Sequence, residues 1–280
     1  MPGRLGSAGC ECQPSDGVAR MNEAMLAEAA ASVVSARLGR RRLARLAGVV
    51  TLEDGYAVQQ RANRQLEAHL GKRVGHKIGG TTETMRRYIN VPEPVAGEVF
   101  ASQCHPSGTT VRRADYVRLG IETEIAVRLG KELPSRDRPY RRSDVADAVA
   151  SVHAAIELVD DRYDGFATIG GPTLIADNAF DTGSLLGEPV ADWRGLDLGA
   201  LTAHTFRDDT LLATGRSDAL LGHPLDALAW IATRRSALKL GLAAGTFVSL
   251  GTITPVQWVE TPASYRIEIG ELGSLALHAA

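Results

Sequence analysis

The stretch Leu119–Gly130 reads Leu-Gly-Ile-Glu-Thr-Glu-Ile-Ala-Val-Arg-Leu-Gly. Its alternation has the period of two that sends successive side chains of a β-strand to opposite faces. Glu122 and Glu124 therefore share one face, while Ile121 and Thr123 belong to the other. Two like charges on one face repel each other, so the pair must be exposed to water or neutralised by a cation. The apolar opposite face and the flanking glycines indicate a core strand, which favours the cation.

A second carboxylate interrupts an apolar run further along the chain. Glu157 lies within His153–Val159, a predicted buried strand, where an unpaired carboxylate would be costly. It therefore needs a partner, which is either an arginine or a metal ion. Together with Glu122 and Glu124 it makes an all-oxygen set on two core strands, and such a set suits Mg²⁺ or Mn²⁺ better than Zn²⁺.

Lys77 is the third candidate for chemistry. It lies in Val74–Ile78, a short apolar strand between glycines, so its ammonium needs a charge partner or a bound anion. The alternative is an ordinary salt bridge to a surface glutamate.

Composition narrows the class of protein. The 280 residues carry a net charge of −2, with 44% hydrophobic and 23% charged residues, which is ordinary for a soluble globular protein. This balance gives no electrostatic reason to expect nucleic acid or a membrane surface as partner. No apolar run approaches the roughly 18 residues of a membrane span. Three cysteines are too few for a disulfide framework, so we expect a cytoplasmic protein.

The chain divides into three parts by composition and residue pattern. Residues 1–21 are rich in Gly, Pro and Ser and are predicted to be a disordered leader. Residues 22–72 are predicted to be helical, with one helix over 22–46 and a second that runs from the capping-box pattern at Thr51 to Leu70. Residues 73–280 alternate short strands with turns and are predicted to form a β-rich catalytic core with the metal site. Helices followed by strands favour an α+β fold.

Several segments occur in an order that resembles a known family. They are Gly75-His-Lys-Ile-Gly, the Glu122/Glu124 strand, Ile156-Glu-Leu-Val-Asp and Leu174-Ile-Ala-Asp-Asn-Ala. Together they resemble the 2-oxopent-4-enoate hydratase and 4-oxalocrotonate decarboxylase branch of the fumarylacetoacetate hydrolase superfamily. The similarity covers roughly residues 22–280, and the joint order of the segments is its most specific sign.

The resemblance implies a mixed β-roll core with an N-terminal helical segment and peripheral helices. It also implies Mg²⁺ or Mn²⁺ held by Glu122, Glu124 and Glu157, with Lys77 at the active-site lysine position. Thr252 and Asp177 correspond to substrate-binding segments. The expected partners are a small 2-oxo acid and further copies of the chain in a homo-oligomer, with a paralogous pathway enzyme as a further possible partner.

Two positions depart from the family pattern. Val95 stands where the hydratases carry an aspartate that handles protons or water, and Glu93 or Glu98 is a nearby candidate to replace it. Arg234 and Arg235 follow a position where asparagine is common. One of them would bind a second substrate carboxylate, or both lie on a solvated helix face.

The function that the resemblance favours is hydration of a 2-oxo-4-enoate by a metal-dependent lyase. Decarboxylation of a vinylogous 2-oxo diacid is the leading alternative, because it needs no water-activating acid at Val95. Carbon–carbon hydrolysis of an acylpyruvate is a third option. A catalytically impaired homologue that serves as a partner subunit is a fourth.

Overall fold

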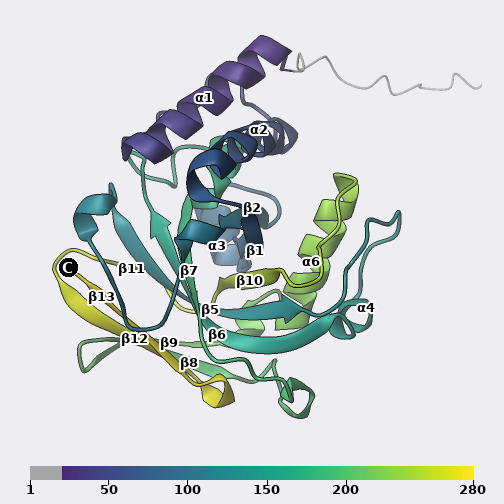
Figure 1. Ribbon diagram of the computed structural model, residues 1–280, viewed down its shortest axis with the longest axis vertical. Helices are drawn as coiled ribbons and strands as arrows, with labels where there is room; N and C mark the ends of the chain where they lie inside the picture. The colour runs from purple at the N-terminus through teal and green to yellow at the C-terminus, as the bar shows by residue number, and fades with distance from the viewer. Residues whose placement is uncertain (1–20) are drawn as a thin grey trace, which may run out of the picture.

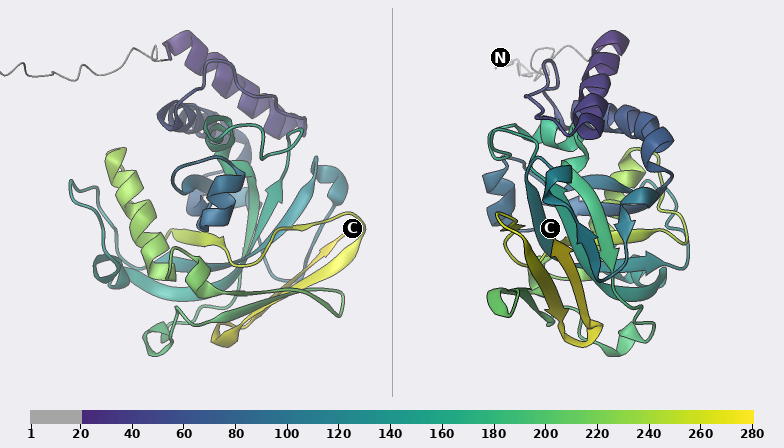
Figure 2. Two further views of the ribbon diagram at one scale, coloured as in Figure 1. Left: turned by 180° about the vertical axis from the view of Figure 1, so that it is seen from behind. Right: turned by 60° about the vertical axis from the view of Figure 1, so that its left-hand side comes forward.

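The computed structural model describes residues 21–280, and residues 1–20, nearly all of the predicted leader, lie outside the described part. Two long helices pack at one end of a pair of curled sheets, and a third long helix lies along one side (Figures 1 and 2). The helices are α1 (Glu23–Gly39), α2 (Leu52–Leu70), α3 (Glu83–Tyr88), α4 (Arg142–Ala146), α5 (Gly171–Ala176) and α6 (Pro224–Ala237).

The helix ends follow local sequence signals. The capping box predicted at the start of α2 is confirmed: Thr51 Oγ1 accepts from Asp54 N at 3.1 Å, and Asp54 Oδ2 accepts from Thr51 N at 2.9 Å. The prediction that the first helix continues to residue 46 is wrong. Helix α1 stops at Gly39, and Arg40 adopts a left-handed conformation with φ of 51°.

The chain after α1 is held by tertiary hydrogen bonds instead of helical ones. Leu43 N donates to Arg162 O at 2.8 Å, and Leu46 N donates to Thr173 Oγ1 at 3.1 Å. These bonds satisfy backbone groups that a longer helix would have satisfied internally.

Within residues 21–280, thirteen strands form two mixed sheets. The larger sheet has the order β2-β1-β10-β5-β6-β7-β3, with β11 paired to β5, and the smaller has the order β4-β13-β12-β8-β9. The strands are β1 (Arg73–Gly79), β2 (Val95–Phe100), β3 (Cys104–His105), β4 (Thr109–Val111), β5 (Leu119–Leu129), β6 (Val149–Asp160), β7 (Asp181–Leu186), β8 (Thr202–Arg207), β9 (Thr210–Arg216), β10 (Phe247–Thr252), β11 (Gln257–Trp258), β12 (Ala263–Ile269) and β13 (Ser274–Ala279).

Strands β5 and β6 form the longest antiparallel pair and the centre of the core. The strand expected over His153–Val159 is confirmed and starts earlier, at Val149. The apolar face of β5 packs toward the smaller sheet, where Thr123 and Thr205 hydroxyls lie 2.7 Å apart. The opposite face of β5 is therefore left to Glu122 and Glu124.

The α+β fold with an N-terminal helical segment and a curled, mixed β core is confirmed (Figure 1). Among the described helices, none combines the length and the apolar character needed to cross a bilayer.

Candidate metal centre and active site

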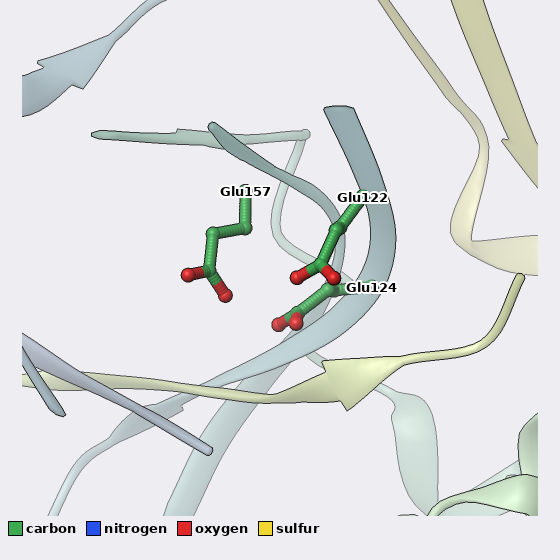
Figure 3. Close-up of side chains that lie close together, drawn as sticks. All are labelled: Glu122, Glu124 and Glu157. Carbon is green, nitrogen blue, oxygen red and sulfur yellow. The ribbon is translucent and has the colours of Figure 1, made fainter. Parts of the chain in front are cut away.

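Three buried glutamates converge on one side of the β5–β6 pair. The antiparallel register places Glu122 directly opposite Glu157, and Glu124 follows two residues later on the same face. One carboxylate oxygen from each side chain lies within 4.8 Å of those from the other two (Figure 3). Their exposures are 6%, 0% and 0% for Glu122, Glu124 and Glu157, so solvent does not separate the charges.

Burial is the largest cause that raises the pKa of each carboxyl above its ordinary value. The pKa of Glu157 rises to about 7, with the Lys77 ammonium opposing the effect of burial. The carboxylates of Glu157 and Glu122 raise the pKa of Glu124 further. As bare anions the three groups are costly, so the cluster favours either protons or a cation.

The oxygen atoms of the cluster are only partly used by protein donors. Glu124 Oε2 accepts from the Ser249 hydroxyl and from Gly251 N, the latter at 3.3 Å. Glu124 Oε1 and Glu157 Oε2 have no hydrogen-bond partner among residues 21–280. Oxygens of Glu124 and Glu157 that lack protein donors, in a cluster of three converging carboxylates, fit a hard divalent cation such as Mg²⁺ or Mn²⁺.

Lys77 reaches the cluster from β1. Its Nζ lies 2.8 Å from Glu157 Oε1 and donates to the carbonyl of Ala179 at 2.9 Å. Burial alone would lower the pKa of Lys77, but the carboxylates of Glu157, Glu122 and Asp181 outweigh it, so the pKa is raised and the group is an ammonium. Gly97 lies opposite Lys77 on β2, and a Cβ there would come within 3.1 Å of the lysine side chain.

The carbonyl that receives Lys77 belongs to an unusual turn. Asn178, Ala179 and Phe180 all have positive φ, of 60°, 50° and 49°. Non-glycine residues rarely hold this conformation unless their surroundings fix it. Here the Asn178 side chain accepts from Glu98 N at 2.8 Å and donates to Glu98 O, which ties the turn to β2.

A small, largely apolar pocket opens beside Lys77 and Glu122. Thr252 and Val95 also line it, and its other walls are Ile78, Gly79, Gly80, Met85, Ile89, Leu174, Ala179 and Phe180. Such a pocket, with a few convergent polar groups on an apolar wall, is typical of a site for a small organic ligand. The Thr252 hydroxyl donates to Thr254 O at 2.7 Å.

Asp177 lies outside this pocket. Its Oδ2 accepts from Arg162 at 2.8 and 3.0 Å and from the Tyr163 hydroxyl at 2.7 Å, while Oδ1 lies 3.4 Å from Arg37 Nη1. Both oxygens are therefore occupied by protein donors. Substrate binding by Asp177 stays a prediction, and this placement gives it no support.

The candidates for replacing an acid at Val95 also lie elsewhere. Val95 is buried and lines the pocket, whereas Glu98 faces away and pairs with Arg73 and Arg235. Glu93 is 41% exposed and lies 3.9 Å from Arg234. Neither glutamate is part of the pocket wall, and neither are Arg234 and Arg235.

Asp181 is a residue of the site that sequence patterns did not predict. This residue is fully buried at the start of β7, and neither of its carboxylate oxygens has a hydrogen-bond partner among the described residues. Burial, followed by the charge of Glu157, raises the pKa of Asp181 to about 7. No periodicity or motif marks this position, because its closeness to the cluster depends on the β6–β7 register.

Comparisons with known proteins agree with this arrangement. The family described as fumarylacetoacetate (FAA) hydrolase C-terminal matches residues 81–278. A 2-keto-4-pentenoate hydratase from Paraburkholderia phymatum is 34% identical over 221 residues, covering 79% of this chain and 83% of the relative. A 4-oxalocrotonate decarboxylase from Pseudomonas putida is 29% identical over 227 residues, covering 81% and 85%.

A solved structure extends the similarity to the whole described fold. The 4-oxalocrotonate decarboxylase from Pseudomonas putida G7, complexed with magnesium and adipate, superposes with a TM-score of 0.87 at 25% identity, over 93% of this chain and 99% of that one. The buried glutamates, the curled sheet and these matches lead to one conclusion: the chain belongs to the fumarylacetoacetate hydrolase family.

Proposed function

We propose that this protein is a divalent-metal-dependent lyase that hydrates a small 2-oxo-4-enoate. The observation that carries the proposal is the convergence of three buried carboxylates, with Lys77 beside them, next to an apolar pocket that Lys77 and Glu122 line. The hydratases at 34% identity support the same substrate class.

Glu122, Glu124 and Glu157 would hold Mg²⁺ or Mn²⁺. When bound, the cation would polarise the 2-oxo group of the substrate and stabilise the negative charge that develops there. The fit rests on the buried oxygens that lack protein donors and on the all-oxygen chemistry of the set.

Lys77 holds a proton on the pocket wall. Its ammonium is oriented by Glu157 and by the carbonyl of Ala179, and its side chain lines the pocket. We propose that it transfers a proton during tautomerisation of the dienol to the conjugated ketone. Thr252 would bind the substrate carboxylate by turning its hydroxyl from Thr254 O toward the pocket.

Decarboxylation of a vinylogous 2-oxo diacid is the second candidate. Val95 favours it, because the pocket wall has no carboxyl at this position to activate water. Loss of CO₂ needs stabilisation of the resulting carbanion but no water-activating acid.

The two candidates are separated by paired substrates. The protein with Mg²⁺ or Mn²⁺ is incubated with 2-oxopent-4-enoate and, separately, with 2-oxohex-3-enedioate, and ultraviolet absorbance and CO₂ release are followed. Loss of absorbance from the first substrate without CO₂ supports hydration, and CO₂ release from the second supports decarboxylation. If the metal binds but neither substrate is consumed, both candidates are wrong.

A further inference from the structure

A second hollow lies behind the β1–β2 pair. His76 and Lys77 are neighbours on β1, so their side chains point to opposite faces. Lys77 lines the pocket beside the glutamates, whereas His76 lines a hollow between α2 and α6, which lie above and to the right of β1 and β2 in Figure 1. We call this hollow the arginine pocket, after Arg64, Arg73, Arg234 and Arg235 in its wall.

Two of the four guanidinium groups are neutralised by the protein. Glu98 lies between Arg73 and Arg235: its Oε2 is 2.9 Å from Arg73 Nη1, and its Oε1 is 3.1 Å from Arg235 Nη1. Arg73 also pairs with Glu67 at 2.9 Å. Burial, followed by the charge of Arg235, lowers the pKa of His76 to about 3, so this side chain adds no charge.

The other two guanidinium groups, of Arg234 and Arg64, have no buried carboxylate beside them among the described residues. The Arg234 guanidinium lies over the Tyr56 ring, 4.2 Å from its centre, and its side chain is only 13% exposed. Its Nε and Nη2 have no hydrogen-bond acceptor among the described residues. The nearest carboxylates, of Glu53 and Glu93, are 3.5 and 3.9 Å away and are 73% and 41% exposed, and ion pairs in such positions contribute little.

Arg64 is exposed on α2 and makes no ion pair with residues 21–280 within 4.0 Å. Glu67 and Glu98 balance two of the four arginines, and the other two, Arg64 and Arg234, have only the partly exposed Glu53 and Glu93 near Arg234 as counter-charges. Buried N–H groups without acceptors cost free energy, and an anion that accepts from them would offset that cost.

We propose that the arginine pocket is a binding site for a small doubly charged anion, either a phosphate group or a dicarboxylate. The planar fork of a guanidinium matches both by bidentate hydrogen bonds. Arg234 lines the hollow beside Tyr56 and its side chain is only 13% exposed, so the recess fits a small ligand better than an extended polyanion. The β1–β2 pair separates this site from the glutamates, and no residue lines both pockets.

The test is calorimetric titration of the full chain with inorganic phosphate and with succinate. EDTA is present so that no cation bound by the glutamates can recruit the anion, and ionic strength is held constant. We expect saturable binding of about one anion per chain. The variant Arg64→Gln/Arg234→Gln should bind at least about 10-fold more weakly. The control Lys131→Gln/Arg216→Gln, which loses the same charge at exposed positions, should bind like the wild type.

Two further variants guard against loss of folding. Arg64→Gln changes an exposed residue and should weaken binding alone, and Arg234→Lys keeps the charge but loses the fork, so it should weaken binding several-fold. Preference for phosphate or succinate identifies the ligand class. The proposal is wrong if neither anion binds saturably, or if the double variant binds like its control. It is also wrong if the double variant changes only the oligomeric state, which would make the pocket a subunit interface.

Discussion

Lys77 and Glu157 are in contact, 2.8 Å apart, although two strands separate their own strands in the sheet. Strand β1 pairs with β10, β10 with β5, and β5 with β6, so a flat sheet would hold the two side chains well apart. The contact exists because the sheet curls around the pocket. Curvature thus brings the ammonium of Lys77 to the three carboxylates.

Replacing Lys77 with glutamine should separate catalysis from metal binding. We expect turnover to fall by about 10²- to 10³-fold, because a positioned proton donor is lost. Mg²⁺ affinity should be unchanged or higher, because Glu157 loses its competing ammonium. Steady-state kinetics and metal titration measure the two effects, with exposed Lys72→Gln as the control. Equal loss of metal binding and turnover would contradict this role.

Glu124→Gln should remove metal binding while keeping the shape of the side chain. Outer residues of metal sites already contribute about 10- to 100-fold to affinity, so loss of a ligand should cost at least about 100-fold. Calorimetric titration with Mg²⁺ and Mn²⁺ measures the change, and the exposed Glu132→Gln is the matched control. Wild-type affinity in Glu124→Gln would exclude the proposed metal centre.

The stabilisation of the protein by Mg²⁺ should grow with pH. The folded-state pKa of Glu157 is about 7, above its ordinary value. The metal-free protein therefore loses stability as pH rises from the ordinary carboxyl pKa to about 7. Protons and Mg²⁺ compete for the same oxygens. The increase in melting temperature caused by Mg²⁺ should therefore be larger at about pH 8 than at about pH 5.5. An equal increase at both pH values, or none, would count against the competition.

Val95→Asp tests which reaction the pocket is built for. An added carboxyl in the pocket wall should raise hydration of 2-oxopent-4-enoate relative to decarboxylation. Burying it should lower the free energy of unfolding by about 2 kcal/mol or more. Product analysis and denaturant titration measure both effects. Val95→Thr, which has a similar shape and no acid, should leave the product ratio unchanged.

Asp177→Asn should act on stability. The carboxylate is surrounded by Arg162, Tyr163 and Arg37 inside the protein, so its removal leaves buried positive charge unpaired. The expected loss in free energy of unfolding is about 3 to 5 kcal/mol. Denaturant titration measures it. A normal stability combined with a raised KM would instead support direct contact with the substrate.

Local patterns in the sequence predicted much of the site. The alternation around Glu122 and Glu124 placed both carboxylates on one face, and the apolar run around Glu157 predicted a buried acid, as the structure has them. The contact of Lys77 with Glu157 could not be predicted from either strand, because it depends on the curvature of the whole sheet. Asp181 could not be predicted because the register between β6 and β7 decides its neighbours.

The surroundings of Arg234 and Arg235 likewise could not be predicted from their own segment. Their helix was predicted, but the direction of each guanidinium depends on Tyr56 and Glu98, which belong to distant segments. Neither residue reaches the pocket beside the glutamates, where a second substrate carboxylate was one expectation.

The curl of the sheet also has a consequence for the order of folding. The three glutamates come from β5 and β6, which pair with each other and are close in sequence. Lys77 joins them only when its strand, β1, pairs with β10, and β10 lies near the C-terminal end of the chain. Pairing between distant segments is slow to form. We therefore expect the nascent chain to pass through a stage in which the acidic cluster exists without Lys77, and in which a bound divalent cation would offset its negative charge.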